Sequence, residues 1–142
     1  MMASAKAQSP FEHLNQKDGL GAGGYDLVSY FGGEPALGDD QWSAEYGGVR
    51  YRFSSESNRN AFQANPDRFV PAYGGWCAYA MLDKDKVEVD PLSFKIVDDR
   101  LFLFYDGFWG DTLKRWNKKL AKTPEGELVE QADRNWTSIL AD

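Results

Sequence analysis

The chain of 142 residues predicts a small α+β domain, and three patterns support this prediction. Two stretches of alternating apolar and polar residues, 42–53 and 94–105, each contain a central pair of turn-forming residues, as antiparallel β-hairpins do. The segments between and after them carry helix-capping residues and apolar side chains at helical spacing. We therefore expect one α+β domain in which two antiparallel β-hairpins form a sheet, packed by about four or five helices.

Length and composition indicate a lead-in over residues 1–18 and one folded domain over residues 19–142. The glycine-rich segment 19–24 is expected to be a flexible entry. An apolar content of 42% with 15% aromatic residues is typical of a packed core. The net charge of −6 argues against nucleic acid and anionic membrane surfaces as partners. No apolar run reaches the roughly 20 residues of a membrane-spanning helix, so we expect no membrane insertion.

The two hairpins are the clearest local predictions. Apolar residues alternate on both sides of Gly47-Gly48, a pair that permits a two-residue turn. The second hairpin is predicted to turn at Asp98-Asp99. Its returning strand, 101–105, is apolar on both faces, which predicts a central strand covered on both sides.

Helices are predicted by their capping residues. Asp26 is placed to cap a helical turn over residues 27–30, and Ser54-Ser55 to cap a helix over 56–64 that ends at Asn65-Pro66.

Three further helices follow a connector at 68–72. They are a short helix over 76–82, a helix capped by Asp111 or Thr112, and a last helix that begins with Thr123 as cap and Pro124 in the first position.

Short motifs follow one another in a fixed order from about residue 19 to residue 137. They are Gly24-Tyr25-Asp26, Tyr51-x-Phe53-Ser54-Ser55, Asn58-Arg59-x-x-Phe62, Asn65-Pro66, Tyr73-Gly74-Gly75-Trp76-Cys77-Ala78-Tyr79-Ala80-Met81, Asp90-Pro91, Leu101-x-Leu103-x-Tyr105 and Asn135-Trp136. In these motifs the chain resembles the stand-alone YHS-domain proteins. The resemblance implies export from the cytoplasm, as in many members, and a link to metal handling, as in shorter YHS domains. Those shorter domains carry several cysteines, whereas this chain has one, so a structural zinc site, which needs about four ligands, is not expected.

Cys77 and Met81 form the most specific candidate site. Residues four apart lie on one face of a helix, with Cβ atoms about 5–6 Å apart. A thiolate and a thioether are soft ligands, which suit Cu(I). We therefore expect copper as the candidate metal, with the alternative that Cys77 is a small buried hydrophobe and Met81 a gap-filler in the core.

Two other functions remain open from the sequence. A thiol-dependent enzyme would need a base for Cys77, and the sole histidine, His13, lies in the lead-in. A metal-free module would bind a small ligand or a protein through aromatic side chains. Its candidate binding residues are Tyr25, Tyr73, Trp76, Tyr79 and Trp109.

From these patterns we expect a non-catalytic binding domain. Ala5-Lys6-Ala7 before Gln8 reads like the end of a signal-peptide cleavage site. Together with the resemblance, it favours the periplasm or another exported location, with the cytoplasm as the alternative.

Overall fold

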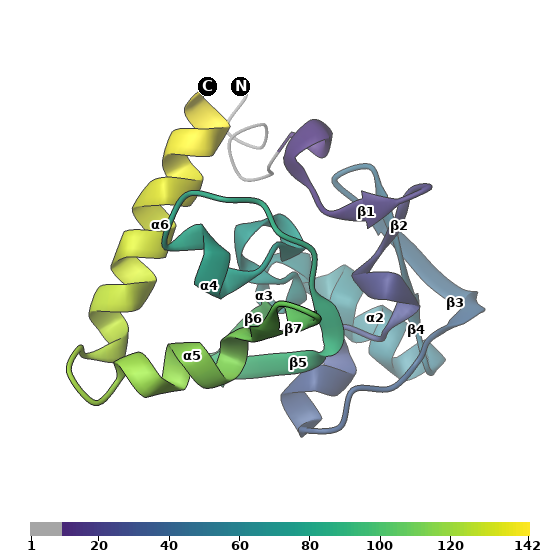
Figure 1. Ribbon diagram of the computed structural model, residues 1–142. Coiled ribbons are helices and arrows are strands. Elements are labelled where there is room, and N and C mark those ends of the chain that lie inside the picture. The colour runs from purple at the N-terminus through teal and green to yellow at the C-terminus, as the bar shows by residue number, and fades with distance from the viewer. Residues whose placement is uncertain (1–9) are drawn as a thin grey trace. The chain divides into compact units, whose positions relative to one another are not determined.

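The computed structural model describes residues 10–142, and the chain divides into two compact units, Met1–Val70 and Pro71–Asp142. The α+β class is confirmed: the described residues contain five α-helices, four 3₁₀ helices and eight β-strands (Figure 1). The cleavage-site motif at Ala5–Ala7 lies outside the described residues.

The N-terminal unit contains a four-stranded sheet with the strand order β1-β2-β4-β3. β1 (Gln16–Lys17) is antiparallel to β2 (Leu20–Gly21), and β2 runs parallel to β4 (Val49–Phe53). Part of the expected lead-in is therefore structured, because it also holds η1 (Phe11–His13).

The first predicted hairpin is confirmed. β3 (Asp39–Tyr46) pairs antiparallel with β4, and Tyr46 lies opposite Val49. The intervening Gly47 and Gly48 have φ values of 62° and 86°, which a two-residue turn matched to the strand twist requires. Val49, Tyr51 and Phe53 are buried, as the alternating pattern predicts.

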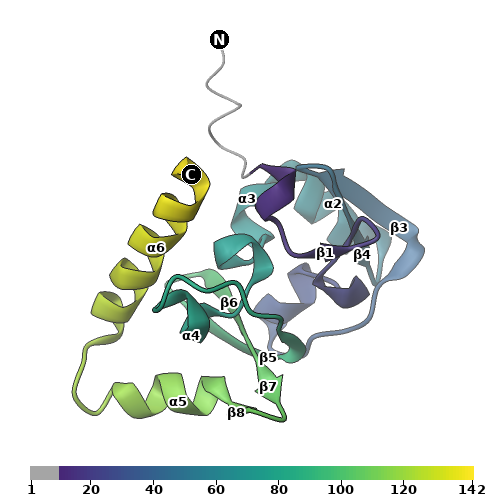
Figure 2. The same cartoon turned by 45° about the horizontal axis from the view of Figure 1, so that its top comes forward.

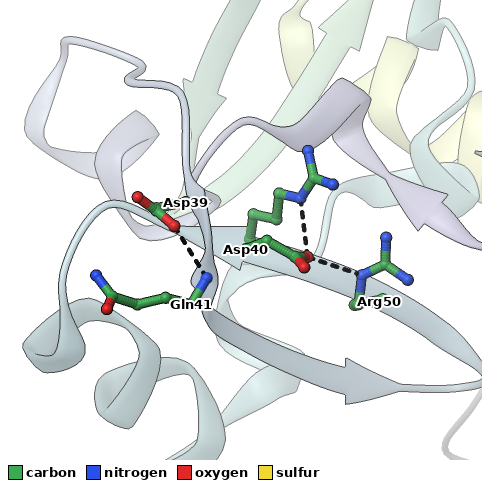
Figure 3. A network of polar contacts seen from close by, with 5 residues as sticks. Asp39, Asp40, Gln41 and Arg50 are labelled. Atoms are coloured by element: carbon green, nitrogen blue, oxygen red, sulfur yellow. Dashed lines mark hydrogen bonds and ion pairs between the residues drawn. The ribbon is translucent and has the colours of Figure 1, made fainter.

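The exposed side of this hairpin carries a small network of polar contacts. Asp40 forms ion pairs with Arg50 Nε at 3.4 Å and with Arg52 Nε at 3.2 Å (Figure 3). Asp39 accepts a hydrogen bond from the Gln41 amide at 2.9 Å. Asp40 is two-thirds exposed, and ion pairs in such positions contribute about 0–1 kcal/mol. We therefore regard this network as a surface feature of the sheet.

Helices complete the N-terminal unit. η2 (Ala22–Gly24) and η3 (Val28–Gly32) precede the hairpin, and α2 (Glu56–Ala64) and α3 (Pro66–Phe69) follow it. Ser55 caps α2 as predicted, since its side chain accepts a hydrogen bond from the Asn58 amide. A connector was expected over residues 68–72, but Arg68 and Phe69 belong to α3. Pro66 both ends one helix and occupies the first turn of the next.

Asp26 is fully buried and ties the unit together. Its Oδ1 accepts from the amides of Val28 and Ser29, at 2.8 and 3.2 Å, so it binds the start of η3, although the N-cap residue of η3 is Leu27 and the helix runs over 28–32, not the predicted 27–30. Its Oδ2 accepts from the amide and hydroxyl of Ser54 and from Asn58 Nδ2, all within 2.8 Å. One carboxylate therefore joins η3 to the junction of β4 and α2.

The C-terminal unit contains the second predicted hairpin, formed by β5 (Asp90–Val97) and β6 (Arg100–Phe104). It turns at Asp98 and Asp99, whose φ values are 50° and 62°. This hairpin is its own two-stranded sheet, whereas the sequence analysis expected both hairpins to form one sheet. β6 is buried along both faces as predicted, but in the described residues it pairs only with β5, so it is not a central strand.

The remaining elements of this unit are η4 (Ala72–Gly75), α4 (Ala78–Met81), the short hairpin β7 (Asp106–Gly107) and β8 (Gly110–Asp111), α5 (Thr112–Lys119) and α6 (Glu125–Ala141). Asp111 caps α5, since Oδ1 accepts from the Lys114 amide at 3.0 Å. Pro124, not Thr123, occupies the cap position of α6, and no side chain caps that end.

The core of the C-terminal unit is centred on Trp116, which is fully buried. Its ring packs against Phe102 and Phe104, with centroids 6.1 and 5.6 Å away. Along α6, Leu128, Ala132 and Ile139 are buried and Leu140 is partly exposed, as the helical period of 3.6 residues requires. In residues 10–142, none of the helices has the length and apolar character of a membrane span.

Replacing Asp26 tests the buried carboxylate. Asp26→Ala leaves several buried donors without an acceptor, so we expect the free energy of unfolding of the full chain to fall by at least about 3 kcal/mol in urea titrations. Asp39→Ala is the matched control, since Asp39 is exposed and accepts a single local hydrogen bond. It should change stability by no more than about 0.5 kcal/mol. Equal effects of the two substitutions would contradict the role assigned to Asp26.

Candidate functional site

Cys77 and Met81, the predicted metal ligands, are both fully buried. Cys77 is the N-cap residue of α4 and Met81 is its last residue, and the Met81 amide donates to the Cys77 carbonyl at 3.1 Å. Met81 belongs to the core cluster around Trp116. The structure thus brings the two residues onto one turn, as predicted, and places both inside the unit.

The sulfur of Cys77 is surrounded by hydrogen-bonding partners. The Tyr105 amide donates to Sγ at 3.2 Å, and Thr112 Oγ1 lies 3.4 Å from Sγ. The Thr112 hydroxyl proton is already directed to the Tyr105 carbonyl, 2.6 Å away. Thr112 Oγ1 thus has an acceptor lone pair facing Sγ, so the Cys77 thiol can donate to Thr112 while it accepts from the Tyr105 amide.

This geometry favours a structural role for Cys77. Coordination of Cu(I) would require the sulfur to lose its proton and the packed core around Cys77 to open for the ion. Neither Tyr105 nor Thr112 is a base that would activate a thiol nucleophile. In the part of the chain that the structure describes, no group of three or more His, Cys, Asp and Glu side chains is arranged to hold a metal ion.

Tyr73 occupies a strained and buried position. Its φ of 60° is in the left-handed region, which bulky residues seldom adopt, and Gly74 and Gly75 continue in the same region. The Tyr73 hydroxyl donates to Asp133 Oδ1 at 2.9 Å, and Arg100 holds the same carboxylate through two contacts of 3.1 Å. Burial raises the pKa of Tyr73, and Asp133 adds to the rise. These contacts between η4, β6 and α6 account for the strain without a ligand.

The other predicted aromatic residues divide between packing and exposure. Trp76 and Tyr79 are partly buried against the core around Trp116. Tyr25 lies in the N-terminal unit, where its backbone forms an isolated bridge with Leu37. Trp109, in contrast, is 75% exposed.

Trp109 and its neighbour Phe108 form what we call the aromatic tip. They are the two loop residues between β7 and β8, in which Gly107 pairs with Gly110. Phe108 is 90% exposed, and its ring meets the Trp109 indole edge to face, with centroids 5.0 Å apart. Figure 2 shows this hairpin leading directly into α5. Large aromatic side chains exposed together in this way are typical of a contact surface.

Two side chains hold the backbone of the aromatic tip. Tyr105 Oη accepts from the Trp109 amide at 3.0 Å, and Arg115 Nη2 donates to the Trp109 carbonyl at 2.8 Å. The flanking glycines make room for both. A Cβ at Gly107 would lie 2.8 Å from Tyr105 Oη, and one at Gly110 would overlap the Arg115 guanidinium.

The base of the hairpin is closed by the hydrogen bonds that surround Cys77. The Tyr105 carbonyl accepts from both the amide and the hydroxyl of Thr112, at 3.0 and 2.6 Å, while the Tyr105 amide is bound to Cys77 Sγ. Cys77 thus contacts Tyr105 and Thr112, the residues directly before and after the 106–111 loop. The sequence analysis did not identify Tyr105, Thr112 or Arg115 as site residues. The symmetric run Asp-Gly-Phe-Trp-Gly-Asp was the one local signal for a two-residue loop.

Comparison of the chain with family models, curated proteins and solved structures gave no match. The resemblance to YHS-domain proteins therefore stays a prediction from sequence motifs.

The thiol of Cys77 should be protected in the folded protein. Because Sγ is fully buried and hydrogen bonded, we expect a disulfide reagent to modify it only when the fold opens. The labelling rate of the native protein should be at least about a hundredfold lower than that of the protein unfolded in urea. Absorbance of the released thiol measures this rate. Rapid labelling of the native protein would show that the thiol is accessible and would revive the metal and enzyme hypotheses.

The bracing of the aromatic tip predicts an effect on amide exchange. Tyr105→Phe removes the acceptor of the Trp109 amide, so hydrogen exchange at that amide should accelerate by up to about tenfold, as expected for loss of a hydrogen bond worth about 0.5–1.5 kcal/mol. Tyr46→Phe, which removes a phenolic hydroxyl in the N-terminal unit, is the control. It should leave the exchange rate of the Trp109 amide unchanged. Equal exchange rates in wild type and Tyr105→Phe would contradict the bracing role.

Proposed function

We propose that the protein is a non-catalytic binding domain that contacts a protein partner through the aromatic tip, Phe108 and Trp109. The observation that carries the proposal is the combination of high exposure with a held backbone. Loops that only connect elements have no need of two large rings in water, and Trp is among the commonest energetic centres of protein interfaces.

The exposure of the two rings favours a protein partner over a small ligand. Small-molecule sites are concave and bury most of the ligand surface between several side chains. Phe108 and Trp109 are too exposed to line such a cavity, and they are suited to enter a pocket on a partner. Leu92, 58% exposed, lies in β5, a strand that contacts β7, and it would extend the apolar contact.

The held backbone supports the same proposal energetically. Binding costs free energy when it orders a mobile loop, and a loop that is already ordered avoids that cost. The Trp109 amide donates to Tyr105 Oη and the Trp109 carbonyl accepts from Arg115, so both polar groups of Trp109 are bound before any partner arrives.

Cu(I) binding at Cys77 and Met81 is the weaker proposal. The two sulfur-bearing residues lie four positions apart, but both are fully buried, and the core around them would have to open to admit the ion. The resemblance to YHS-domain proteins is compatible with either function, since the role of the stand-alone members is largely unassigned.

Selection from a displayed library of random 12-residue peptides tests the proposed function. We expect binders whose affinity falls at least about 30-fold in Trp109→Ser, since removal of a central interface residue costs about 2 kcal/mol or more. Calorimetry on individual peptides measures the affinity.

Leu37→Ser is the matched control, because Leu37 is also an exposed apolar residue, 64% exposed, but lies in the N-terminal unit. It should change the affinity for the same peptides by no more than about twofold. Binders that respond equally to both substitutions, or not at all, would refute the aromatic tip as the contact site.

A further inference from the structure

Beside the aromatic tip, α5 carries a concentration of positive charge in an acidic protein. Five of the sixteen basic residues of the chain fall between Lys114 and Lys122, a stretch with no acidic residue. The rest of the chain contains the other eleven basic residues and all twenty-two acidic residues. The five are Lys114, Arg115, Lys118, Lys119 and Lys122.

Four of these residues cover one flank of α5. Lys114 with Lys118, and Arg115 with Lys119, are four residues apart, so each pair lies in one row along the helix. Trp116 projects into the core from the other flank. We call Lys114, Arg115, Lys118 and Lys119 the basic flank.

The basic flank adjoins the aromatic tip. The Arg115 guanidinium donates to the Trp109 carbonyl, so its charge lies at the tip itself. Asp111, at the start of α5, uses its carboxylate to cap the Lys114 amide. The side chains of the basic flank form no ion pair within residues 10–142.

Internal contacts account for part of this arrangement, since Arg115 donates to the Trp109 carbonyl and the Lys119 ammonium lies over the Tyr79 ring, 5.9 Å from its centroid. Like charges four apart destabilise a helix, and a cation in the first turn, such as Lys114, is unfavourable beside the positive end of the helix dipole. Lys118 and Lys119 do lie in the favourable last turn. Lys114 gains nothing of this kind, and its exposed charge is available to a partner.

We propose that the partner of the aromatic tip is an acidic protein segment, in which apolar side chains receive Phe108 and Trp109 while Asp and Glu residues face the basic flank. This inference rests on the proposed function. An anionic bilayer fits less well, because a wide surface of negative charge would also meet the acidic remainder of a chain of net charge −6. A peptide segment presents its charge locally, within the roughly 8 Å over which charges act at physiological salt.

The test uses the full chain and the same displayed library of 12-residue peptides. We expect the Trp109-dependent binders to be enriched in both acidic and apolar residues. Lys114→Glu with Lys118→Glu should weaken them at least about tenfold at 50 mM NaCl and by less at 500 mM. Lys84→Glu with Lys86→Glu makes the same change in net charge on an exposed turn outside α5, and it should change affinity by less than about twofold.

The outcomes separate this inference from the proposed function. Absence of Trp109-dependent binders would refute the proposed function. Trp109-dependent binders with no acidic enrichment, or with no response to the charge reversal, would refute the acidic partner alone. Binding to phosphatidylglycerol vesicles that requires Trp109, without enrichment of acidic peptides, would overturn the inference in favour of a membrane surface. Thermal melting of each variant confirms that it is folded.

Discussion

The carbonyl group of Tyr105 is the point on which the display of the aromatic tip depends. It accepts hydrogen bonds from the amide and the hydroxyl of Thr112, and the amide of the same residue is bound by the buried thiol of Cys77. These contacts bring the two ends of the 106–111 loop together inside the unit. The loop can then project Phe108 and Trp109 into solvent while its base stays fixed to the core.

This arrangement gives the single cysteine a different role from the one its chemistry first suggests. A thiol with a methionine four residues later could be a soft-metal pair, but Cys77 lies in a closed set of hydrogen bonds. A metal at Sγ would have to fit beside the Tyr105 amide and Thr112 Oγ1, in a core where Cys77 is fully buried. Cys77 thus contacts the two residues that flank the aromatic-tip hairpin.

The parts of the fold that could be predicted are those determined by neighbouring residues. Gly47-Gly48 and Asp98-Asp99 turn where expected because left-handed backbone is a local property, and Ser55 and Asp111 cap the helices that they precede. Contacts between distant residues could not be predicted. Thr112 reaches Cys77 across 35 residues, and no periodic pattern marks that pair. The exposed Trp109 could be suspected from the sequence, but its bracing by Arg115 required the structure.

The most direct test of the account is backbone ¹⁵N relaxation at Phe108 and Trp109 in the free protein. A braced aromatic tip should give order parameters near 0.85, like those of a rigid backbone, although both side chains are exposed. The residues of β5 and β6 provide the internal reference. Values below about 0.6 at Phe108 and Trp109 would show a flexible loop and would contradict the claim that the fold presents these two rings as a preformed contact site.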